Sequence, residues 1–398
     1  MTDRPSETMP ATGVLFVISS LSVGGTERHL LSISRALRAR GWKVAVCCTG
    51  GEGPLADDFR AAGVKVFAAP SARLPAFRRL RPALAAVHLM SVLVKERVAL
   101  IHFFLPEAYL IGAPLALLAG IKLRIMSRRS LNAYQRKYMV AGFLERRWHS
   151  LMAAVLANSR AVLRELELEG ARPERLGLIY NGLDVGVQAR RSRDAIRAEL
   201  GLKHDALVFI IVANLIQYKG HLDLIEAFAR AADRLPQGWR LLVVGRDDGA
   251  GPATKALAAS HGIADSILFL GARSDVPDLL NASDIGLLSS HEEGFSNAII
   301  EGMRARLPMI VTAVGGNAEA VINGETGVVV PPRDPAALAD AIAELSSDSQ
   351  RRRNYGDSGR RRMEQNFALG SCVAAYEATY RGLLAGKSPS EITEIHRP

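Results

Sequence analysis

The sequence predicts an α/β protein of two doubly wound domains, each with a parallel sheet and helices on both faces. Three observations indicate this fold class. Apolar runs suited to buried strands alternate with helical segments along almost the whole chain. The alternation starts again after residue 201 with a second long apolar run. The length of 398 residues exceeds that of one ordinary domain and suggests two, each of roughly 180 residues.

The first half opens with Val14–Leu21, a continuous apolar run typical of a strand buried on both faces. A Ser-Val-Gly-Gly turn follows, and Thr26–Arg40 then carries apolar side chains at helical spacing until Gly41 ends the helix. Further strands are expected at Lys43–Cys48, Val64–Ala68, Ala99–Phe104, Leu123–Met126, Val155–Asn158 and Leu176–Tyr180.

The second half begins after the polar stretch VGVQARRSRDAIRAELG, interpreted as the domain boundary plus a short helix. Helices are expected at His221–Ala232 and Asn297–Arg304. Strands are expected at Ala206–Ala213, Arg240–Gly245, Ile267–Gly271, Asp284–Ser289, Met309–Thr312 and Gly327–Val330. The predicted domains are 1–188 and 189–365, and a helix within 366–398 is expected to pack back on the first domain.

Composition indicates a soluble globular protein, with 48% hydrophobic and 23% charged residues. The amino terminus has no apolar segment typical of a secretory signal. The most apolar stretch, 108–121, is shorter than the ~18–20 residues that span a bilayer. Three cysteines favour a reducing compartment. The expected location is cytoplasmic, with peripheral contact to the inner face of the cytoplasmic membrane as a variant.

Positive charge is concentrated in the first half. Residues 1–185 contain 26 basic and 14 acidic side chains, whereas residues 186–398 contain 24 and 26. Much of the excess lies in Arg73–Arg81 and Lys122–Arg147, among apolar and aromatic residues. This predicts an anionic partner, either a phosphorylated or lipid-linked acceptor or an anionic membrane surface. The alternative is a soluble acceptor and a merely basic surface. No nucleic acid is expected, because no known binding module is evident.

Ligands of doubly wound folds bind where loops follow the carboxyl ends of strands. After the first strand, Gly24 and Gly25 allow close backbone approach, and their amides are expected to face an anion. In the second domain, Lys219 follows the first strand just before a helix, where it is placed to hold a diphosphate. Taken singly, the alternatives are an ordinary turn and an exposed loop lysine.

The segment HEEGFSNAIIE places two acids around a helix start. Glu293 lies in the loop, Gly294 turns the chain, and Ser296 or Asn297 is expected to cap the helix. The amides of Phe295–Asn297 then point toward the ligand edge as an anion cradle. Glu301 lies just over one turn into the helix and leans back toward its start. Taken singly, Glu293 is better explained as a helix-dipole partner in the first turn, and Glu301 as an ordinary surface acid.

The same segment matches the E-x7-E motif of retaining glycosyltransferases with the GT-B fold, of the family 4 (glycosyl transferases group 1) type. The sequence resembles this family further through GMRARLPMIVTAVGGNAEAVINGETGVVVPP, and upstream through NGLD, YKG, LLVVG, FLGARSDV and ASDIGLLSS in the family's order. The resemblance covers about residues 13–385 and is densest over 206–332. It implies two Rossmann-like domains facing each other across a cleft.

The resemblance also implies residue roles. Glu301 would bind the ribose hydroxyls of a nucleotide, and Glu293 the hydroxyls of the transferred sugar. Lys219 would neutralise the diphosphate leaving group, with backbone donors from Phe295–Asn297. Gly25 would approach the diphosphate from the first domain. The family usually needs no bound metal, and no cofactor is expected beyond the nucleoside-diphosphate sugar donor.

Two departures from the family pattern concern arginines. The family often has Gly-Arg where this chain has Ala213 and Asn214, so Arg246 is the candidate second cation for the diphosphate. The resemblance also implies that the loop from Arg273 lies near the base of the nucleotide. The resemblance places the acceptor beside the end of the fifth strand of the first domain. Many members have a histidine there, and this chain has Arg128 followed by Arg129.

His102, at the end of the fourth strand, is a third candidate for the acceptor side, although a structural histidine explains it better. The implied reaction is retaining transfer of a hexose-like sugar in polysaccharide, lipopolysaccharide or glycolipid assembly. The rival functions are a GT-B nucleotide-sugar epimerase and a basic nucleotide- or nucleic-acid-binding protein. A nicotinamide dehydrogenase would need G-x-G-x-x-G after a leading strand, which neither domain contains.

Overall fold

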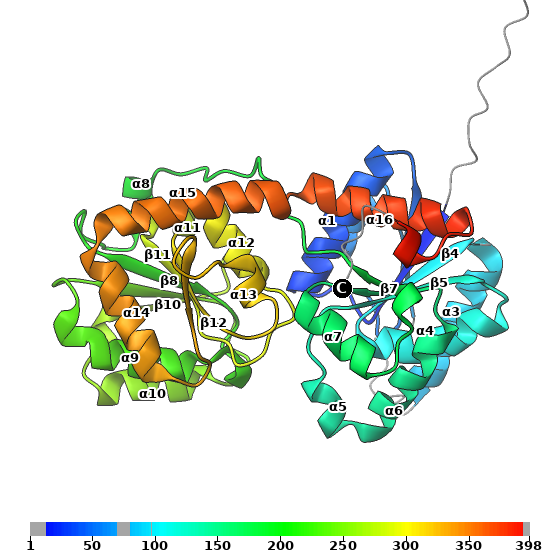
Figure 1. Cartoon of the computed structure of the whole chain (residues 1–398), viewed down its shortest axis with the longest axis horizontal. Coiled ribbons are helices and arrows are strands. Elements are labelled where there is room, and N and C mark those ends of the chain that lie inside the picture. Colours follow the sequence, from blue (N-terminus) through cyan, green and yellow to red (C-terminus); the bar gives the residue numbers. More distant parts are fainter. Residues whose placement is uncertain (1–12, 70–79, 97, 393–398) are drawn as a thin grey trace, which may run out of the picture. The chain divides into compact units, whose positions relative to one another are not determined.

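The computed structural model describes residues 13–69, 80–96 and 98–392, in which the chain forms two compact units (Figure 1). Unit 1 runs to Tyr180 and resumes at Leu369, and unit 2 spans Asn181–Ala368. Each unit is built around one parallel sheet with helices packed on it, which confirms the predicted α/β fold class. None of the described helices is long and apolar enough to cross a membrane.

Unit 1 contains a seven-stranded sheet in the order β3-β2-β1-β4-β5-β6-β7. Every strand pair is parallel. The strands are β1 Gly13–Ile18, β2 Lys43–Cys48, β3 Lys65–Ala68, β4 Leu100–Phe104, β5 Leu123–Arg128, β6 Ala154–Ala157 and β7 Leu176–Leu178.

The two faces of this sheet carry separate hydrophobic clusters. Phe16 and Ile18 of β1 belong to one cluster and Leu15 and Val17 to the other, as alternation along a doubly covered strand requires. Helices α1, α2 and α16 cover the first face, and α3, α4 and α7 the second. The helices are α1 Gly25–Ala39, α2 Ala56–Ala61, α3 Arg81–Glu96, α4 Pro106–Leu118, α5 Ala133–Lys137, α6 Met139–Trp148, α7 Arg160–Leu168 and α16 Leu369–Leu384.

Helix α16 returns to unit 1 from the end of the chain. Its Tyr376 and Tyr380 are fully buried in the first cluster, beside residues of α1. The last helix therefore completes the core of the unit that the first strand begins.

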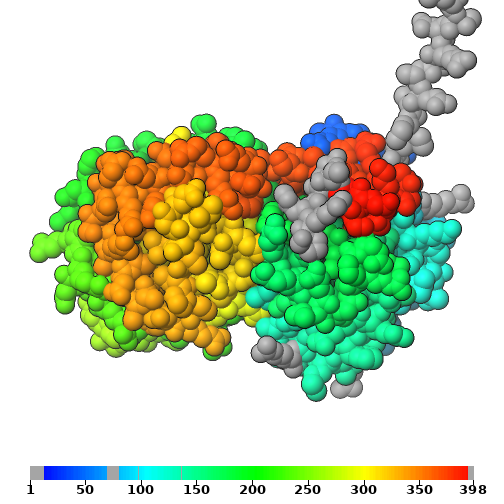
Figure 2. Space-filling view, viewed as in Figure 1, coloured from blue at the N-terminus to red at the C-terminus, as the bar shows by residue number. Residues whose placement is uncertain are grey.

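Unit 2 contains a six-stranded parallel sheet in the order β10-β9-β8-β11-β12-β13. Helices α9, α10 and α14 pack together, as do α8 with α11 and α12 with α15. Figure 2 shows α14 and α15 covering one side of this unit. The strands are β8 Val208–Val212, β9 Arg240–Val244, β10 Ile267–Gly271, β11 Ile285–Leu288, β12 Met309–Thr312 and β13 Gly327–Val330. The helices are α8 Arg193–Glu199, α9 His221–Ala231, α10 Gly251–Ser260, α11 Val276–Ala282, α12 Asn297–Arg304, α13 Asn317–Ala320, α14 Pro335–Ser347 and α15 Ser349–Asn366.

The division between the units lies at Tyr180 and Asn181, eight residues before the boundary expected from the sequence. Segment 181–188 is held by unit 2, because the Asn181 side chain donates to the backbone oxygen of Phe295 at 3.2 Å. The Arg304 guanidinium likewise donates to the backbone oxygen of Asp184 at 3.1 Å. The sequence placed the boundary in the polar stretch 185–201, whereas these hydrogen bonds already hold Asn181 and Asp184 in unit 2.

Candidate functional site

The loops after three neighbouring strands of unit 2 meet at one edge of its sheet. β8 pairs with β11, and β11 pairs with β12, all in parallel. Segments 213–220, 289–296 and 313–316 therefore leave the sheet at the same edge, where ligands of such folds bind. The first segment contains Lys219 and the second contains Glu293.

Lys219 and Glu293 contact each other directly. The Lys219 Nζ lies 2.5 Å from Glu293 Oε1, and Ser290 Oγ donates to the same oxygen at 2.8 Å. Only 17% of the Lys219 side chain and 10% of the Glu293 side chain are exposed. Burial alone would lower the pKa of Lys219, but the Glu293 carboxylate outweighs burial and raises that pKa. The two side chains that sequence analysis singled out for chemistry thus form one largely buried ion pair.

Main-chain contacts set the position of this pair. Gly220 has a φ of +69°, and a Cβ on it would lie 2.0 Å from the backbone oxygen of Ser289, so only glycine fits. His291 N donates to Tyr218 O at 2.7 Å, and Ser289 Oγ donates to Lys219 O at 3.0 Å. The ammonium and the carboxylate are therefore carried by two loops that are bonded to each other.

A second pair of glycines brings the loop after β12 against the same site. Gly315 has a φ of +50°, and a Cβ on it would lie 1.7 Å from the backbone oxygen of Glu293. Gly316 N donates to Gly294 O at 2.8 Å. Sequence analysis used this Gly-Gly turn only as part of a family match. Its position directly after an apolar strand is the signal that would have assigned it to the site.

The start of α12 is fixed by contacts on both sides of its first residue. Ser296 is the N-cap residue, and its side chain makes no capping hydrogen bond. Asn181 Nδ2 donates to Asn297 Oδ1 at 2.7 Å and also to the backbone oxygen of Phe295. The Phe295 ring is buried against Phe367, with centroids 5.2 Å apart. These contacts anchor the three residues whose amides were expected to cradle an anion.

Glu301 is half-buried on α12. It lies four residues after Asn297 and so on the same face of the helix, and its side chain leans toward the helix start. Glu293 and Glu301 therefore stand on either side of the point where α12 begins.

The candidate arginines of unit 2 are each paired with a carboxylate. Arg246 Nε donates to Asp248 Oδ1 at 2.6 Å, and Asn214 Nδ2 donates to Asp248 Oδ2 at 2.9 Å. Hydrogen bonding to Asp248 raises the pKa of Arg246. Arg273 contacts both carboxylate oxygens of Asp275, at 2.6 and 2.8 Å. A diphosphate would have to compete with these acids for either guanidinium.

In unit 1, a carboxylate lies against the glycine turn after β1. Gly24 is the N-cap residue of α1 and Gly25 its first residue. A Cβ on Gly24 would lie 2.4 Å from Glu27 Oε2, while Ser22 Oγ donates to Glu27 Oε1 at 3.1 Å. Sequence analysis expected bare amides facing an anion here and missed Glu27. An acid in the first turn of a helix was the available signal.

Arg128 lies in the interior of unit 1. Its guanidinium is 2.7 Å from Glu145 Oε1 and 2.7 Å from Glu169 Oε2, and all three side chains are at least 97% buried. His149 Nε2 lies 3.1 Å from Glu169 Oε2. Burial opposes the charge on Arg128, but Glu145 leads the interactions that raise its pKa. Arg128 thus joins β5, α6 and α7, and an acceptor reaching it would have to enter this cluster.

His102 and Arg129 lie on the first face of the same sheet. His102 is fully buried, with Nδ1 2.8 Å from Tyr380 Oη and Nε2 2.8 Å from Ser127 Oγ. Burial, followed by the charge of Arg129, lowers the pKa of His102 well below its usual range. Arg129 is half-buried, and burial lowers its own pKa, with Tyr376 partly offsetting this. His102 therefore serves as a core histidine with both ring nitrogens engaged.

Metal ligands are not gathered in the part of the chain that the structure describes. No group of three His, Cys, Asp or Glu side chains there has an arrangement that could hold a metal ion.

Comparisons with known proteins match both halves of the chain. The family model described as glycosyl transferases group 1 matches residues 192–362, and the model described as Glycosyltransferase Family 4 matches residues 23–187. Among solved structures, the Anabaena protein HepE in complex with UDP and glucose has a TM-score of 0.82 at 21% identity, covering 93% of this chain and 100% of that one.

Two curated relatives are more similar in sequence over shorter stretches. N-acetyl-alpha-D-glucosaminyl L-malate synthase of Bacillus anthracis is 31% identical over 232 residues, 58% of this chain and 60% of the relative. D-inositol 3-phosphate glycosyltransferase of Mycobacteroides abscessus is 36% identical over 186 residues, 45% of this chain and 41% of the relative. The chain thus spans about two fifths to three fifths of the curated relatives it matches.

Proposed function

Because the chain belongs to the family 4 type of glycosyltransferases with the GT-B fold, we propose that it moves a sugar from a nucleoside-diphosphate sugar to an acceptor hydroxyl and retains the anomeric configuration. The Lys219–Glu293 contact, beside the start of α12, carries this proposal. It joins a cation suited to a diphosphate with an acid suited to sugar hydroxyls at the ligand edge of a parallel sheet.

The pair suggests how a donor binds. The diphosphate takes Lys219 as its counter-ion, and the sugar hydroxyls donate to Glu293, so each charge exchanges one partner for another. As the bond to the sugar breaks, negative charge grows on the departing phosphate, and Lys219 with the first amides of α12 stabilises it. Glu293 holds the sugar in place and forms no covalent bond in this scheme.

The comparisons support the choice of ligands. The HepE structure was solved with UDP and glucose, so UDP-sugars are the first donors to test. The names of the two curated relatives contain L-malate and D-inositol 3-phosphate, which are both anionic. An anionic acceptor, either a saccharide derivative or a lipid-linked phosphate, fits the 26 basic and 14 acidic residues of 1–185. The same proposal assigns the transfer reaction to polysaccharide, lipopolysaccharide or glycolipid assembly.

A thermal-shift panel of nucleoside diphosphates and their sugars tests donor binding. One nucleotide series should raise the melting temperature by mass action, and the Lys219→Met variant should lose the shift. Release of the free nucleoside diphosphate from that donor should then depend on an added acceptor. A panel without any shift, or a sugar that is epimerised and not transferred, would overturn the proposal.

We also propose that α6 rests on an anionic membrane surface. Met139, Val140 and Phe143 are 77%, 75% and 68% exposed, and they share one stripe of the helix with Arg146 and Arg147. The opposite side of α6 is buried. A soluble helix normally exposes polar residues, whereas an apolar face edged by arginines fits an anionic lipid surface. Of Arg73–Arg81, the other basic segment expected at a membrane, residues 73–79 lie outside the described residues.

A further inference from the structure

Unit 2 has a cavity whose lining does not include the Lys219–Glu293 pair. It has a volume of about 480 Å³, within the range of small-molecule sites, and lies between segment 187–192, α11 and the carboxyl end of α12. Its lining contains no acidic side chain but five arginines, namely Arg190, Arg191, Arg304, Arg306 and Arg360. The cavity lies at the carboxyl end of α12. The amides at the amino end of the same helix are roughly 12 Å away, the length of eight helical residues.

The Arg304 guanidinium is buried, and the charges of two acids, Glu301 and Asp184, act on it. Only 8% of the residue is exposed, and it donates to the backbone oxygen of Asp184 at 3.1 Å. Within the described residues it forms no ion pair. Burial lowers the pKa of Arg304, Glu301 offsets part of this, and Arg360 adds to it. Buried charges in proteins are usually paired, so a guanidinium facing a cavity without an acid favours an anionic ligand.

Arg306 occupies a backbone position at which glycine is usual. It follows the end of α12 with a φ of +60°, and the amides of Arg306 and Leu307 close the last turn on Met303 O and Gly302 O. This is the helix-ending geometry in which glycine avoids the strain of the left-handed region. A non-glycine residue held there suggests a function for its side chain. Its ion pair with Asp357 is exposed on both sides, and such pairs are weak enough to yield to a ligand.

The segment that carries Arg190 and Arg191 is also fixed. The amides of Arg190 and Arg191 both donate to Asp278 Oδ1, at 2.6 and 3.4 Å, and Asp278 is buried in α11. The guanidinium of Arg360 donates to the backbone oxygens of Arg304 and Val185 at 2.8 and 3.2 Å. The arginines thus stand on a frame held by main-chain hydrogen bonds.

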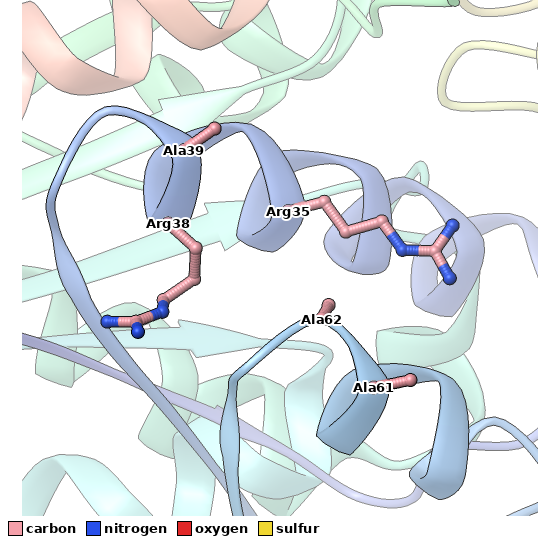
Figure 3. Close-up of a pocket in the computed structure, with 5 residues that line it drawn as sticks. All are labelled: Arg35, Arg38, Ala39, Ala61 and Ala62. Atoms are coloured by element: carbon pink, nitrogen blue, oxygen red, sulfur yellow. The ribbon is translucent and has the colours of Figure 1, made fainter.

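We propose that this pocket binds a small phosphorylated compound. Guanidinium groups match phosphate oxygens in bidentate geometry, and arginines grouped around one cavity suit a ligand with several phosphoryl oxygens. Arg191 and Arg360, like Arg306, each pair with an acid outside the lining, so the ligand would compete with Glu199 and Glu364 for them. The cavity between α1 and α2 in unit 1 offers a contrast, because Figure 3 shows its Arg35 and Arg38 pointing in opposite directions. Arg38 there donates to the backbone oxygen of Trp42 at 2.9 Å.

Titration calorimetry with inorganic pyrophosphate tests the proposal in the Lys219→Met protein, which lacks the diphosphate cation of the first site. Saturable binding should remain. Arg306→Gly and Arg190→Ala should each weaken it about tenfold, the effect of losing one charge-assisted contact. Arg306→Gly also removes the backbone strain, so it should fold at least as well as the parent.

Arg333→Gly is the matched control. Arg333 has a φ of +59° and lies outside the pocket lining, so its replacement removes the same charge and the same strain. It should leave binding within about twofold. Hydrogen exchange should slow in segments 187–192 and 304–306 when pyrophosphate is added. Any of three results would overturn the proposal. Saturable pyrophosphate binding could be lost in the Lys219→Met protein, or Arg333→Gly could weaken binding as much as Arg306→Gly does. The slowing of hydrogen exchange could also be confined to segments 214–220 and 289–297.

Discussion

At the scale of single residues, the proposed function predicts that a change at the Lys219–Glu293 contact shifts nucleotide binding and turnover in opposite directions. Glu293→Gln removes the carboxylate that holds Lys219 at 2.5 Å, so the ammonium becomes free for a diphosphate. The affinity for a nucleoside diphosphate should rise severalfold. Transfer should fall about 100-fold, because the sugar loses the acid that positions it. Calorimetry with the diphosphate and a transfer assay measure the two effects.

Ser290→Ala is the control for that variant. It removes the 2.8 Å hydrogen bond to Glu293 Oε1 and leaves both charges in place. Each effect should then stay at about fivefold or less. A Glu293→Gln protein that transfers sugar at the wild-type rate would contradict the role assigned to this acid.

His221 makes the stability of unit 2 depend on pH. It is 2% exposed at the start of α9, and burial, followed by the charge of Lys219, lowers its pKa to about 4. An unfolded histidine titrates near 6.5, so below that pH the unfolded chain binds a proton that the folded chain does not. Stability should be fully present above about pH 6.5 and fall as pH approaches 4, by about 3 kcal/mol in total.

Urea unfolding of the wild type and of His221→Gln, at several pH values between 7.5 and 4.5, measures this loss. The variant lacks the titrating group, so the free-energy difference between the two proteins should shrink as the pH falls. A difference that stays constant over this interval would show that His221 does not titrate between the two states.

At the scale of secondary-structure elements, Arg128 holds β5 to α6 and α7 through Glu145 and Glu169. Arg128→Met leaves two buried carboxylates without their cation, which should cost about 3–5 kcal/mol of unfolding free energy. Adding Glu145→Gln and Glu169→Gln should restore much of it. Chemical denaturation measures both proteins. A variant that keeps its stability and loses only activity would instead support a direct role at the acceptor.

The Arg128 cluster also shows where sequence information ends. Its acids lie 17 and 41 residues from Arg128, and nothing in their local pattern pairs them with it. Arg128 was accordingly interpreted from its position at the end of a strand. His102 was placed better, since a polar residue inside an apolar strand commonly meets a hydrogen-bond partner in the core. Its partner Tyr380 comes from a helix 278 residues away, which local sequence does not reveal.

Elements with local signals were predicted closely. Helix α12 has the expected bounds, because the Gly294 turn and the polar Ser296 before Asn297 are visible in the sequence, although the Ser296 side chain makes no capping hydrogen bond. The first strand was expected to reach Leu21, but β1 ends at Ile18, where its pairing with β2 ends. Ser19 and Ser20 follow Ile18 directly, so the change from apolar to polar residues was an available sign of the strand end. The expected strand ran past these serines to Leu21, whereas the pairing with β2 stops before them.

At the scale of the whole molecule, the excess of positive charge and the exposed apolar face of α6 both belong to unit 1. Residues 1–185 carry the excess of basic side chains, and α6 in that unit exposes Met139 and Phe143 next to Arg146. The second unit has no such excess, although its candidate site is the one proposed to bind the donor. This separation fits a protein that takes a soluble donor on one unit and meets an anionic surface or acceptor with the other.

Vesicle sedimentation tests this division of roles. The wild type should bind vesicles containing anionic phospholipid, and salt should weaken the binding because surface charges are screened. Met139→Ser with Phe143→Ser should reduce binding at least tenfold, since two apolar side chains no longer enter the interface. Leu168→Ser on α7, where Leu168 is 89% exposed, removes a similar apolar side chain elsewhere and should change little. Equal losses from both changes, or equal binding to neutral vesicles, would show that α6 is an ordinary exposed helix and that the positive charge of unit 1 serves a soluble acceptor instead.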